Sequence, residues 1–192
     1  MKQLKMYRRA QEMVPVPLPD GITVRNYENN SDIATWVELC KCGIFDDNAT
    51  LECWDRFILN DQNICPETDV YFLICDGNAC ATVTAVADHE TKIGRVHMVA
   101  ADPSCRGQGI GNYLTFLCVN RLAAEGMEWM SLSTDDWRIP AIKSYIKQGF
   151  RPVNWDTDMV ERWTSILPAL GCSELEMLNE DFTFNCTLRV QS

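Results

Sequence analysis

Three glycines and an arginine lie close together in the segment Arg106-Gly107-Gln108-Gly109-Ile110-Gly111. The apolar run before this segment, ending at Ala101, is typical of a strand, and apolar residues at three- to four-residue steps after it predict a helix. A turn of this kind leaves unpaired backbone N–H groups at the positive end of a helix dipole. Glycines let a ligand approach the backbone closely, and Arg106 adds a charged donor. The predicted chemistry is binding of a diphosphate.

Two common phosphate-binding patterns do not fit this turn. The pattern G-x-G-x-x-G needs a third glycine where the chain has Asn112 or Leu114, depending on the register. The P-loop needs a Gly-Lys-Ser/Thr sequence, which does not follow. What fits is Arg-x-x-Gly-x-Gly preceded by Val-Ala-Ala-x-Pro. This stretch, Val99 to Gly111, resembles the acyl-CoA pyrophosphate signature of the GNAT N-acyltransferase superfamily.

A second stretch supports the resemblance. The pattern A-x-x-x-Y-x-x-x-G-F, from Ala141 to Phe150, is similar to the second GNAT signature, in which the tyrosine approaches the coenzyme sulfur. Many GNAT sequences have an asparagine three residues before this alanine, where it contacts pantetheine. The chain has Arg138 there, which is expected to reach a coenzyme phosphate or an acidic substrate group, or to face solvent.

The resemblance implies roles for these residues. Main-chain groups around Val99 would pair with the pantetheine arm, and one N–H near Val99 would polarise the thioester carbonyl. Tyr145 would be the general acid that protonates the leaving thiolate, although a tyrosine packed on its helix face is the alternative. The implied coenzyme-binding residues are Val99, Ala100, Ala101, Arg106, Gly107, Gln108, Gly109, Ile110, Gly111, Arg138 and Ala141.

The general base is expected to be His97. It lies two residues before Val99 on the predicted strand, so both side chains should project to one face. Its position resembles that of the histidine on this strand in certain aralkylamine acetyltransferases. A histidine that titrates near neutrality suits deprotonation of an ammonium, directly or through water. The alternatives are a purely structural histidine, or another base among Asp88, His89, Asp135 and Asp136.

These residues must be positioned by a sheet and its helices. Helices are expected from Asn30 or Ser31, over Asn48–Asn60, after Gly111, from Pro140 to Lys147 and over Thr157–Leu170. Strands are expected at Ile22–Arg25, Val70–Cys75, Ala79–Ala87, up to Ala101, at Trp129–Ser133, from Phe150 to Val153 and at Phe182–Val190, with a short edge strand at Leu4–Arg8. The Asp76-Gly77-Asn78 segment predicts a hairpin. The resemblance implies an α/β GNAT fold, with a mixed, mostly antiparallel twisted sheet of six or seven strands and helices on both faces.

Length and composition limit the functional classes. With 192 residues, 46% hydrophobic and 23% charged, the chain is expected to form one globular domain, with a core over 22–153, an N-terminal extension over 1–21 and a C-terminal helix and strand over 157–190. A net charge of −10 argues against a nucleic-acid partner. No run approaches the roughly twenty apolar residues of a membrane span. The N-terminus lacks the apolar core of a secretory signal, so a cytoplasmic protein is expected.

Ten cysteines raise the possibility of disulfides, a metal site or a thiol nucleophile. There is no C-x-x-C pair, and the two histidines do not complete a ligand set, so no metal is expected. Reduced thiols are the prediction for a cytosolic chain. Cys105 lies inside the proposed phosphate loop, but no histidine is close to it in sequence, which disfavours a cysteine enzyme.

The resemblance implies an N-acetyltransferase that moves an acetyl group from acetyl-CoA to a primary amine by direct transfer in a ternary complex. The acceptor is expected to be a small molecule, with an amino acid, an antibiotic and a protein N-terminus left open. The chain is expected to be a monomer or a homodimer. The alternative is a non-catalytic module that binds acyl-CoA and has lost turnover.

Overall fold

The structure is a computed structural model that describes residues 2–11, 13–105 and 107–190. The chain divides into two compact units. The central unit consists of residues 10–128, and the terminal unit consists of residues 1–9 and 129–192.

The sheet of the central unit contains four strands in the order β2, β3, β4 and β5, and all neighbours are antiparallel. The strands span Ile22–Asn26, Val70–Cys75, Asn78–Asp88 and Ile93–Ala101. The turn between β3 and β4 has Asp76 at φ +50° and Gly77 at φ +79°. Positive φ at both central residues is the geometry of a tight hairpin, so the predicted hairpin is confirmed.

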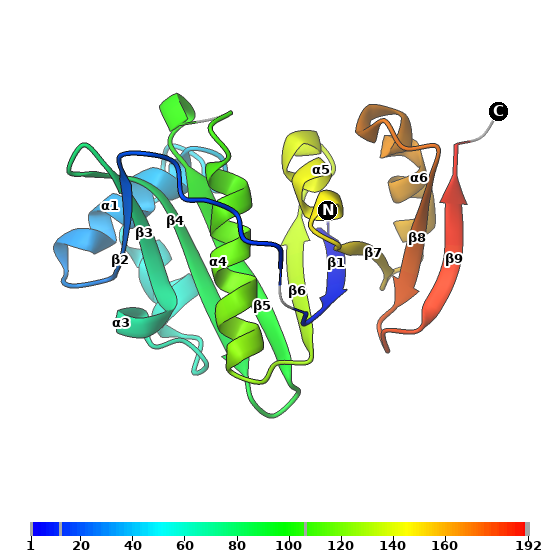
Figure 1. The fold of residues 1–192 in the computed structure, drawn as a ribbon, viewed down its shortest axis with the longest axis horizontal. Helices are drawn as coiled ribbons and strands as arrows, with labels where there is room; N and C mark the ends of the chain where they lie inside the picture. The colour runs from blue at the N-terminus through cyan, green and yellow to red at the C-terminus, as the bar shows by residue number, and fades with distance from the viewer. Residues whose placement is uncertain (1, 12, 106, 191–192) are drawn as a thin grey trace. The chain divides into compact units, whose positions relative to one another are not determined.

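Helices cover both faces of this sheet (Figure 1). Trp36 of α1 (Ser31–Lys41) belongs to one apolar cluster with Phe72 of β3. The preceding residue, Tyr71, lies beneath the Arg121 guanidinium of α4 (Ile110–Ala124), 5.8 Å from ring centre to charge. Because successive strand residues point to opposite faces, α1 and α4 lie on opposite sides of β3.

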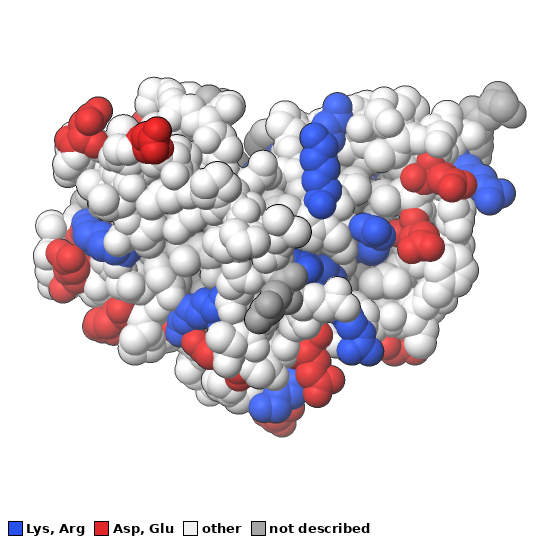
Figure 2. Space-filling view, viewed as in Figure 1, with Lys and Arg blue, Asp and Glu red and all other residues white. Residues whose placement is uncertain are grey.

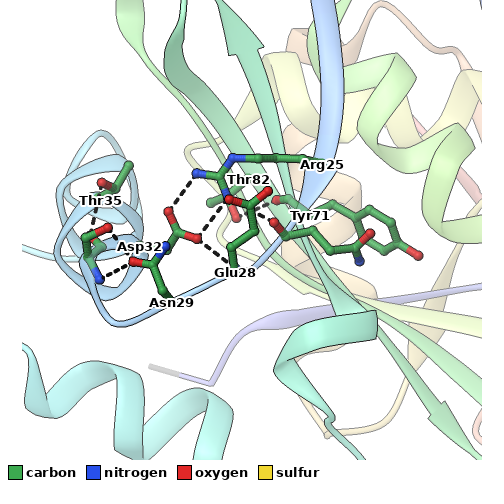
Figure 3. Close-up of polar contacts among 9 residues, drawn as sticks. Arg25, Glu28, Asn29, Asp32, Thr35, Tyr71 and Thr82 are labelled. Carbon is green, nitrogen blue, oxygen red and sulfur yellow. Dashed lines mark hydrogen bonds and ion pairs between the residues drawn. The ribbon is translucent and has the colours of Figure 1, made fainter.

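Polar contacts attach the start of α1 to β2 (Figure 3). Arg25 donates two hydrogen bonds to the Asp32 carboxylate, at 2.8 and 2.6 Å, and Asp32 also accepts the Glu28 N–H at 2.9 Å. The first helical N–H, that of Ser31, is capped by the Asn29 carbonyl oxygen Oδ1 at 2.9 Å. Asn30, one of the two residues expected to begin this helix, stands at the N-cap position, but its side chain makes no capping hydrogen bond.

The segment after α1 differs from the expected regular helix over Asn48–Asn60. It contains a single turn, α2 (Glu52–Trp54), followed by a π-helical turn, η1 (Asp55–Leu59), and a short helix α3 (Pro66–Asp69) precedes β3. Of the apolar residues in this segment, Trp54 and Ile58 are buried, whereas Leu51 is 57% exposed. The wider π turn changes which side chains face the sheet, and periodicity at 3.6 residues does not reveal it.

The terminal unit has a second run of strands, in the order β6 (Trp129–Thr134), β1 (Leu4–Arg9), β7 (Arg151–Asn154), β8 (Glu174–Asn179) and β9 (Phe184–Arg189). Helix α5 (Ile139–Lys147) connects β6 to β7, and α6 (Met159–Leu170) connects β7 to the parallel strand β8. The expectation of an edge strand at Leu4–Arg8 is wrong, because β1 pairs with both β6 and β7. Within the described residues there are nine strands, more than the six or seven expected.

On the face drawn in Figure 2, basic and acidic side chains lie in small groups next to one another rather than in a stripe of one sign. In the part of the chain that the structure describes, no helix is both long enough and apolar enough to cross a membrane. All ten cysteines are free thiols, and Cys105 is buried.

Candidate active site

The glycine-rich loop leads directly into α4 in the central unit. Gly107 and Gly109 have φ values of +80° and +82°, a region that side chains other than glycine rarely adopt. Gly109 is the N-cap residue before the first helical turn and has no side chain with which to cap it. A Cβ added at Gly107, Gly109 or Gly111 would meet no atom within 4 Å. The loop glycines therefore leave room for a ligand at the start of a 15-residue helix, the kind of position at which proteins bind anions.

The loop is held in shape by its own residues. Asp102 accepts the Ser104 N–H at 2.8 Å and the Ser104 hydroxyl at 2.5 Å, and the Asp102 N–H donates to the Cys80 carbonyl of β4. Gln108 donates from Nε2 to the Ser104 carbonyl at 3.2 Å. Ile110 is buried and anchors the first turn of α4. Arg106, predicted as the charged partner of the diphosphate, lies outside the described residues.

Strand β5 contains a bulge at its centre. Thr84 of β4 pairs with His97, but Thr82 pairs with Ala100, so one residue of β4 lies opposite two residues of β5. Met98, the first of the two, has φ +53°, which is strained for a side chain of its size. A bulge leaves one residue outside the hydrogen-bonded ladder. The ladder between β4 and β5 is therefore interrupted at Met98 and Val99.

The bulge changes the expected direction of His97. Regular alternation would place His97 and Val99 on one face, but the register shift interrupts it between these residues. Paired residues point to the same face of a sheet, so His97 shares its face with Ala100, which packs in the α1 cluster. The expectation that His97 and Val99 project together is wrong because β5 contains one residue more than its partner. Ala100 and Ala101 are paired to Thr82 and Ala81 of β4.

A polar pocket of about 450 Å³ opens on the face of β5 that carries His97. Its walls come from η1, the segment after it and the first half of β5. The lining residues are Arg56, Phe57, Asn60, Asp61, Gln62, Asn63, Arg95 and His97. Apart from His97, the sequence analysis identified none of these residues as part of a site. The spacing Arg95-x-His97 on a strand was the one available signal, since it places both side chains on one face.

His97 is neutral at physiological pH. Burial and, to a smaller extent, the nearby Arg95 charge lower the pKa of His97 from its ordinary 6.5 to about 4, although the Phe57 carbonyl and Asp61 oppose the shift. Its Nε2 lies 3.1 Å from the Phe57 carbonyl oxygen of the π turn. In a neutral ring, the nitrogen that faces a carbonyl must be the one that holds the proton. Nδ1 is therefore the nitrogen with a lone pair that can accept a proton.

An ion pair between Arg95 and Asp61 closes the side of this pocket. Burial raises the pKa of Asp61, but the Asn63 N–H and Arg95 outweigh it, and the pKa is lower than usual. Asp61 is therefore ionised and already occupied. His97 is the lining group whose protonation state suits proton acceptance.

The alternative bases make contacts of other kinds. Asp88 accepts the N–H groups of Glu90 and Thr91 in the turn before β5, and these backbone bonds lower its pKa. In the terminal unit, Asp135 pairs with Arg138. Asp136 pairs with Arg162 at 3.0 and 2.5 Å, and this contact lowers the pKa of Asp136. Ion-paired carboxylates with a lowered pKa are weak bases.

The second predicted motif lies in the terminal unit, around α5. Tyr145 is buried, and its ring packs edge-on against Phe150 with centroids 6.0 Å apart. Ala141 lies in the first turn of α5 and is partly buried. Arg138 precedes this helix, lies 3.1 Å from the Asp135 carboxylate and stacks on Trp137. These contacts place Arg138 among side chains of its own unit rather than free in solvent.

The model of the acetyltransferase (GNAT) family matches residues 33–150 of the chain. The chain belongs to this family. The GNAT match includes the loop at the start of α4, the bulge, the pocket and Tyr145, so both predicted motifs lie within it. The predicted superfamily is confirmed.

Similar proteins agree with this assignment. A mycothiol acetyltransferase from Thermomonospora curvata is 28% identical over 156 residues, which cover 78% of this chain and 52% of the relative. The chain therefore spans about half the length of the curated GNAT relatives that it matches.

Solved structures confirm the predicted GNAT fold. A GCN5-related N-acetyltransferase from Sphaerobacter thermophilus has a TM-score of 0.65 at 19% identity, covering 79% of this chain and 48% of the other. The NatC complex bound to a Gag peptide and CoA has a TM-score of 0.56 at 18% identity, covering 67% and 83%. At these identities, the likeness establishes the fold alone.

Proposed function

We propose that the chain transfers an acetyl group from acetyl-CoA to a primary amine of a small molecule, with both substrates bound at once. The observation that carries this proposal is the adjacency of pocket and bulge on β5. His97 lines the pocket, and the next residue, Met98, begins the bulge. An amine in the pocket would thus lie beside the backbone proposed to hold the thioester.

The central unit fits the coenzyme at two places. The open helix start at Gly107, Gly109 and Gly111 suits the diphosphate, and Arg106 is proposed to add its charge. Acetyl-CoA, when bound, supplies a thioester carbonyl. The N–H near Val99, where the bulge interrupts the ladder with β4, is proposed to donate to that carbonyl oxygen. Such a donor contributes about 3 kcal/mol to transition-state stabilisation.

His97 is proposed to accept the proton that the amine nitrogen loses as the new C–N bond forms. A base with a pKa near 4 cannot remove a proton efficiently from a free ammonium, whose pKa is near that of lysine, about 10. The amine must therefore enter unprotonated or lose its proton to water. Once nitrogen bonds to the carbonyl carbon it becomes far more acidic, and neutral Nδ1 is then a sufficient acceptor.

Tyr145 is proposed to protonate the thiolate that leaves when the C–S bond breaks. This role rests on the resemblance of its motif to the second GNAT signature. Tyr145→Phe removes the phenolic proton and keeps the ring that packs on Phe150. We expect kcat to fall by about 10²- to 10⁴-fold while acetyl-CoA affinity stays normal. An unchanged kcat would remove Tyr145 from the mechanism.

Two measurements on one protein sample test the function. Isothermal titration measures acetyl-CoA binding, and a thiol reagent measures release of free CoA over a panel of amines. The panel includes the acceptor used by mycothiol acetyltransferases together with amino acids, simple alkylamines and an N-terminal peptide. Binding with amine-dependent release supports the proposal. Binding with no release for any amine favours the non-catalytic acyl-CoA module, and absence of binding overturns both.

A further inference from the structure

The charges in the pocket are unusual for this chain. The chain carries a net charge of −10, yet the pocket holds two arginines and one carboxylate. Because His97 is neutral, the lining has one positive charge in excess. Most of the remaining lining groups are side-chain amides, which donate and accept hydrogen bonds but carry no charge.

Arg56 is the source of that excess. It is the second residue of the π turn η1 and is exposed. Its guanidinium lies 5.1 Å from the Phe57 ring centre. Within the described residues, Arg56 forms no ion pair. Arg95 gives one nitrogen, Nη2, to Asp61, while its buried Nε has no hydrogen-bond partner in the same part of the chain. A buried charged donor without a partner is costly, and an oxygen ligand would relieve that cost.

The coenzyme phosphates are an unsuitable source of this ligand. The phosphate loop begins after Ala101, whereas Arg95 lies six residues earlier on β5. At 3.3 Å per residue the two positions are about 20 Å apart along the strand. The pocket also opens on the face that carries α1, opposite to α4, whose first turn forms the phosphate site. An anionic group that binds to Arg56 and Arg95 must therefore belong to the second substrate.

We propose that the acceptor carries an anionic oxygen group, a carboxylate or a phosphate, in addition to its amine, and that Arg56 and Arg95 bind this group. The inference rests on the proposed function, because it assigns the pocket to the acceptor. Arg95 and His97 are two residues apart on one face, a separation of about 7 Å. The amine and the anion of the acceptor are therefore separated by only a few bonds.

The first experiment compares matched acceptors. CoA release is measured with β-alanine against β-alaninamide, and with 2-aminoethyl phosphate against ethanolamine, so that carboxylate and phosphate are distinguished. We expect the anionic member of at least one pair to have the higher kcat/KM. Loss of one charge-assisted contact in Arg56→Gln should lower that preference about 10- to 100-fold. Arg189→Gln, an exposed arginine of the terminal unit, is the matched control and should keep the preference.

The second experiment measures binding of the amine to the pocket in the absence of turnover. The chain has two histidines, so ring signals of histidine-labelled protein report His97, with exposed His89 as an internal reference. The anionic amine should shift the His97 signals saturably, its neutral partner should not, and Arg56→Gln should abolish the shift.

The outcomes separate the two proposals. A His97 shift with no CoA release from any amine supports the anion site and counts against the proposed function. Turnover that is equal or better with the neutral amines, or a His97 signal that ignores both anionic probes at millimolar concentration, overturns the anion site and leaves the transferase standing.

Discussion

The two parts of the candidate site in the central unit are built from different materials. The proposed coenzyme loop is one continuous stretch of sequence, from Asp102 to Gly111, and it would bind through main-chain N–H groups, with Gly107 and Gly109 in conformations that favour glycine. The proposed acceptor pocket is formed by side chains from two segments, 56–63 and 95–97, that are far apart in the sequence. A main-chain site tolerates side-chain substitution but not a change of backbone angle, whereas a side-chain site behaves in the opposite way. Mutations can test this contrast.

The largest effect is expected at His97. In His97→Ala the proposed proton acceptor is gone, and kcat should fall by about 10²- to 10⁴-fold. Acetyl-CoA affinity, measured by titration, should be unchanged because the coenzyme loop does not use this side chain. His89→Ala is the control and should keep full activity. Equal losses in kcat and coenzyme affinity would show that the pocket and the coenzyme loop do not act independently.

The next largest effect concerns the support of α1. Asp32→Ala leaves Arg25 and the Glu28 N–H without their buried partner, and should lower the free energy of unfolding by about 3 kcal/mol. Phe57 packs against the α1 cluster, so KM for the amine should rise while coenzyme affinity stays constant. Glu38→Ala removes an exposed ion pair of the same helix and should cost under about 0.5 kcal/mol. Urea denaturation measures both variants.

The protonation of His97 should also be visible in stability. Its pKa is lowered to about 4 in the folded chain, so the unfolded chain binds the proton more readily between that value and 6.5. Stability contributed by the neutral ring is therefore lost as pH falls through this window. Between pH 7 and pH 5 the loss should be about 2 kcal/mol. His97→Gln should lack this loss, and an identical pH dependence in both proteins would contradict the buried, neutral ring.

The smallest effect distinguishes backbone strain from ligand binding. Gly109→Ala and Gly126→Ala place a Cβ at the same φ, +82°, at the two ends of α4. Each should lose about 1 to 2 kcal/mol of stability from left-handed strain. Only Gly109→Ala should weaken acetyl-CoA binding, by roughly 10-fold, which is about 1.4 kcal/mol. Equal affinities in the two variants would mean that the loop does not bind the coenzyme.

The difference between a loop that is continuous in sequence and a pocket built from distant segments also explains which features the sequence could predict. The loop is a local motif, so its residues stand together and their spacing predicts a helix start with exposed N–H groups. The hairpin at Asp76-Gly77 was predictable for the same reason, because its turn chemistry is local. The pocket was not, since Arg56 and Arg95 are 39 positions apart and nothing in either stretch indicates that they meet.

Other errors have the same origin. The pairing of β1 on both sides depends on strands more than a hundred residues away. The face of His97 depends on a bulge that only the register with β4 reveals. No strand was expected at β8. Its residues do alternate, with Leu175 and Met177 buried, but six residues are too few to distinguish a strand from a loop by sequence. Interactions that are local in sequence were predictable, and those that depend on register were not.

The extra residue in β5 has a consequence for how such a protein can diversify. It divides one strand into two halves, residues 93–97 and 99–101, each of which keeps its own alternation of inner and outer positions. A substitution in the earlier half alters what lines the pocket without disturbing the later half. Insertions are best absorbed at the point where the ladder is already interrupted. Under the proposed function, substitutions in the earlier half would change the acceptor, while the residues that bind the acyl carrier stay the same.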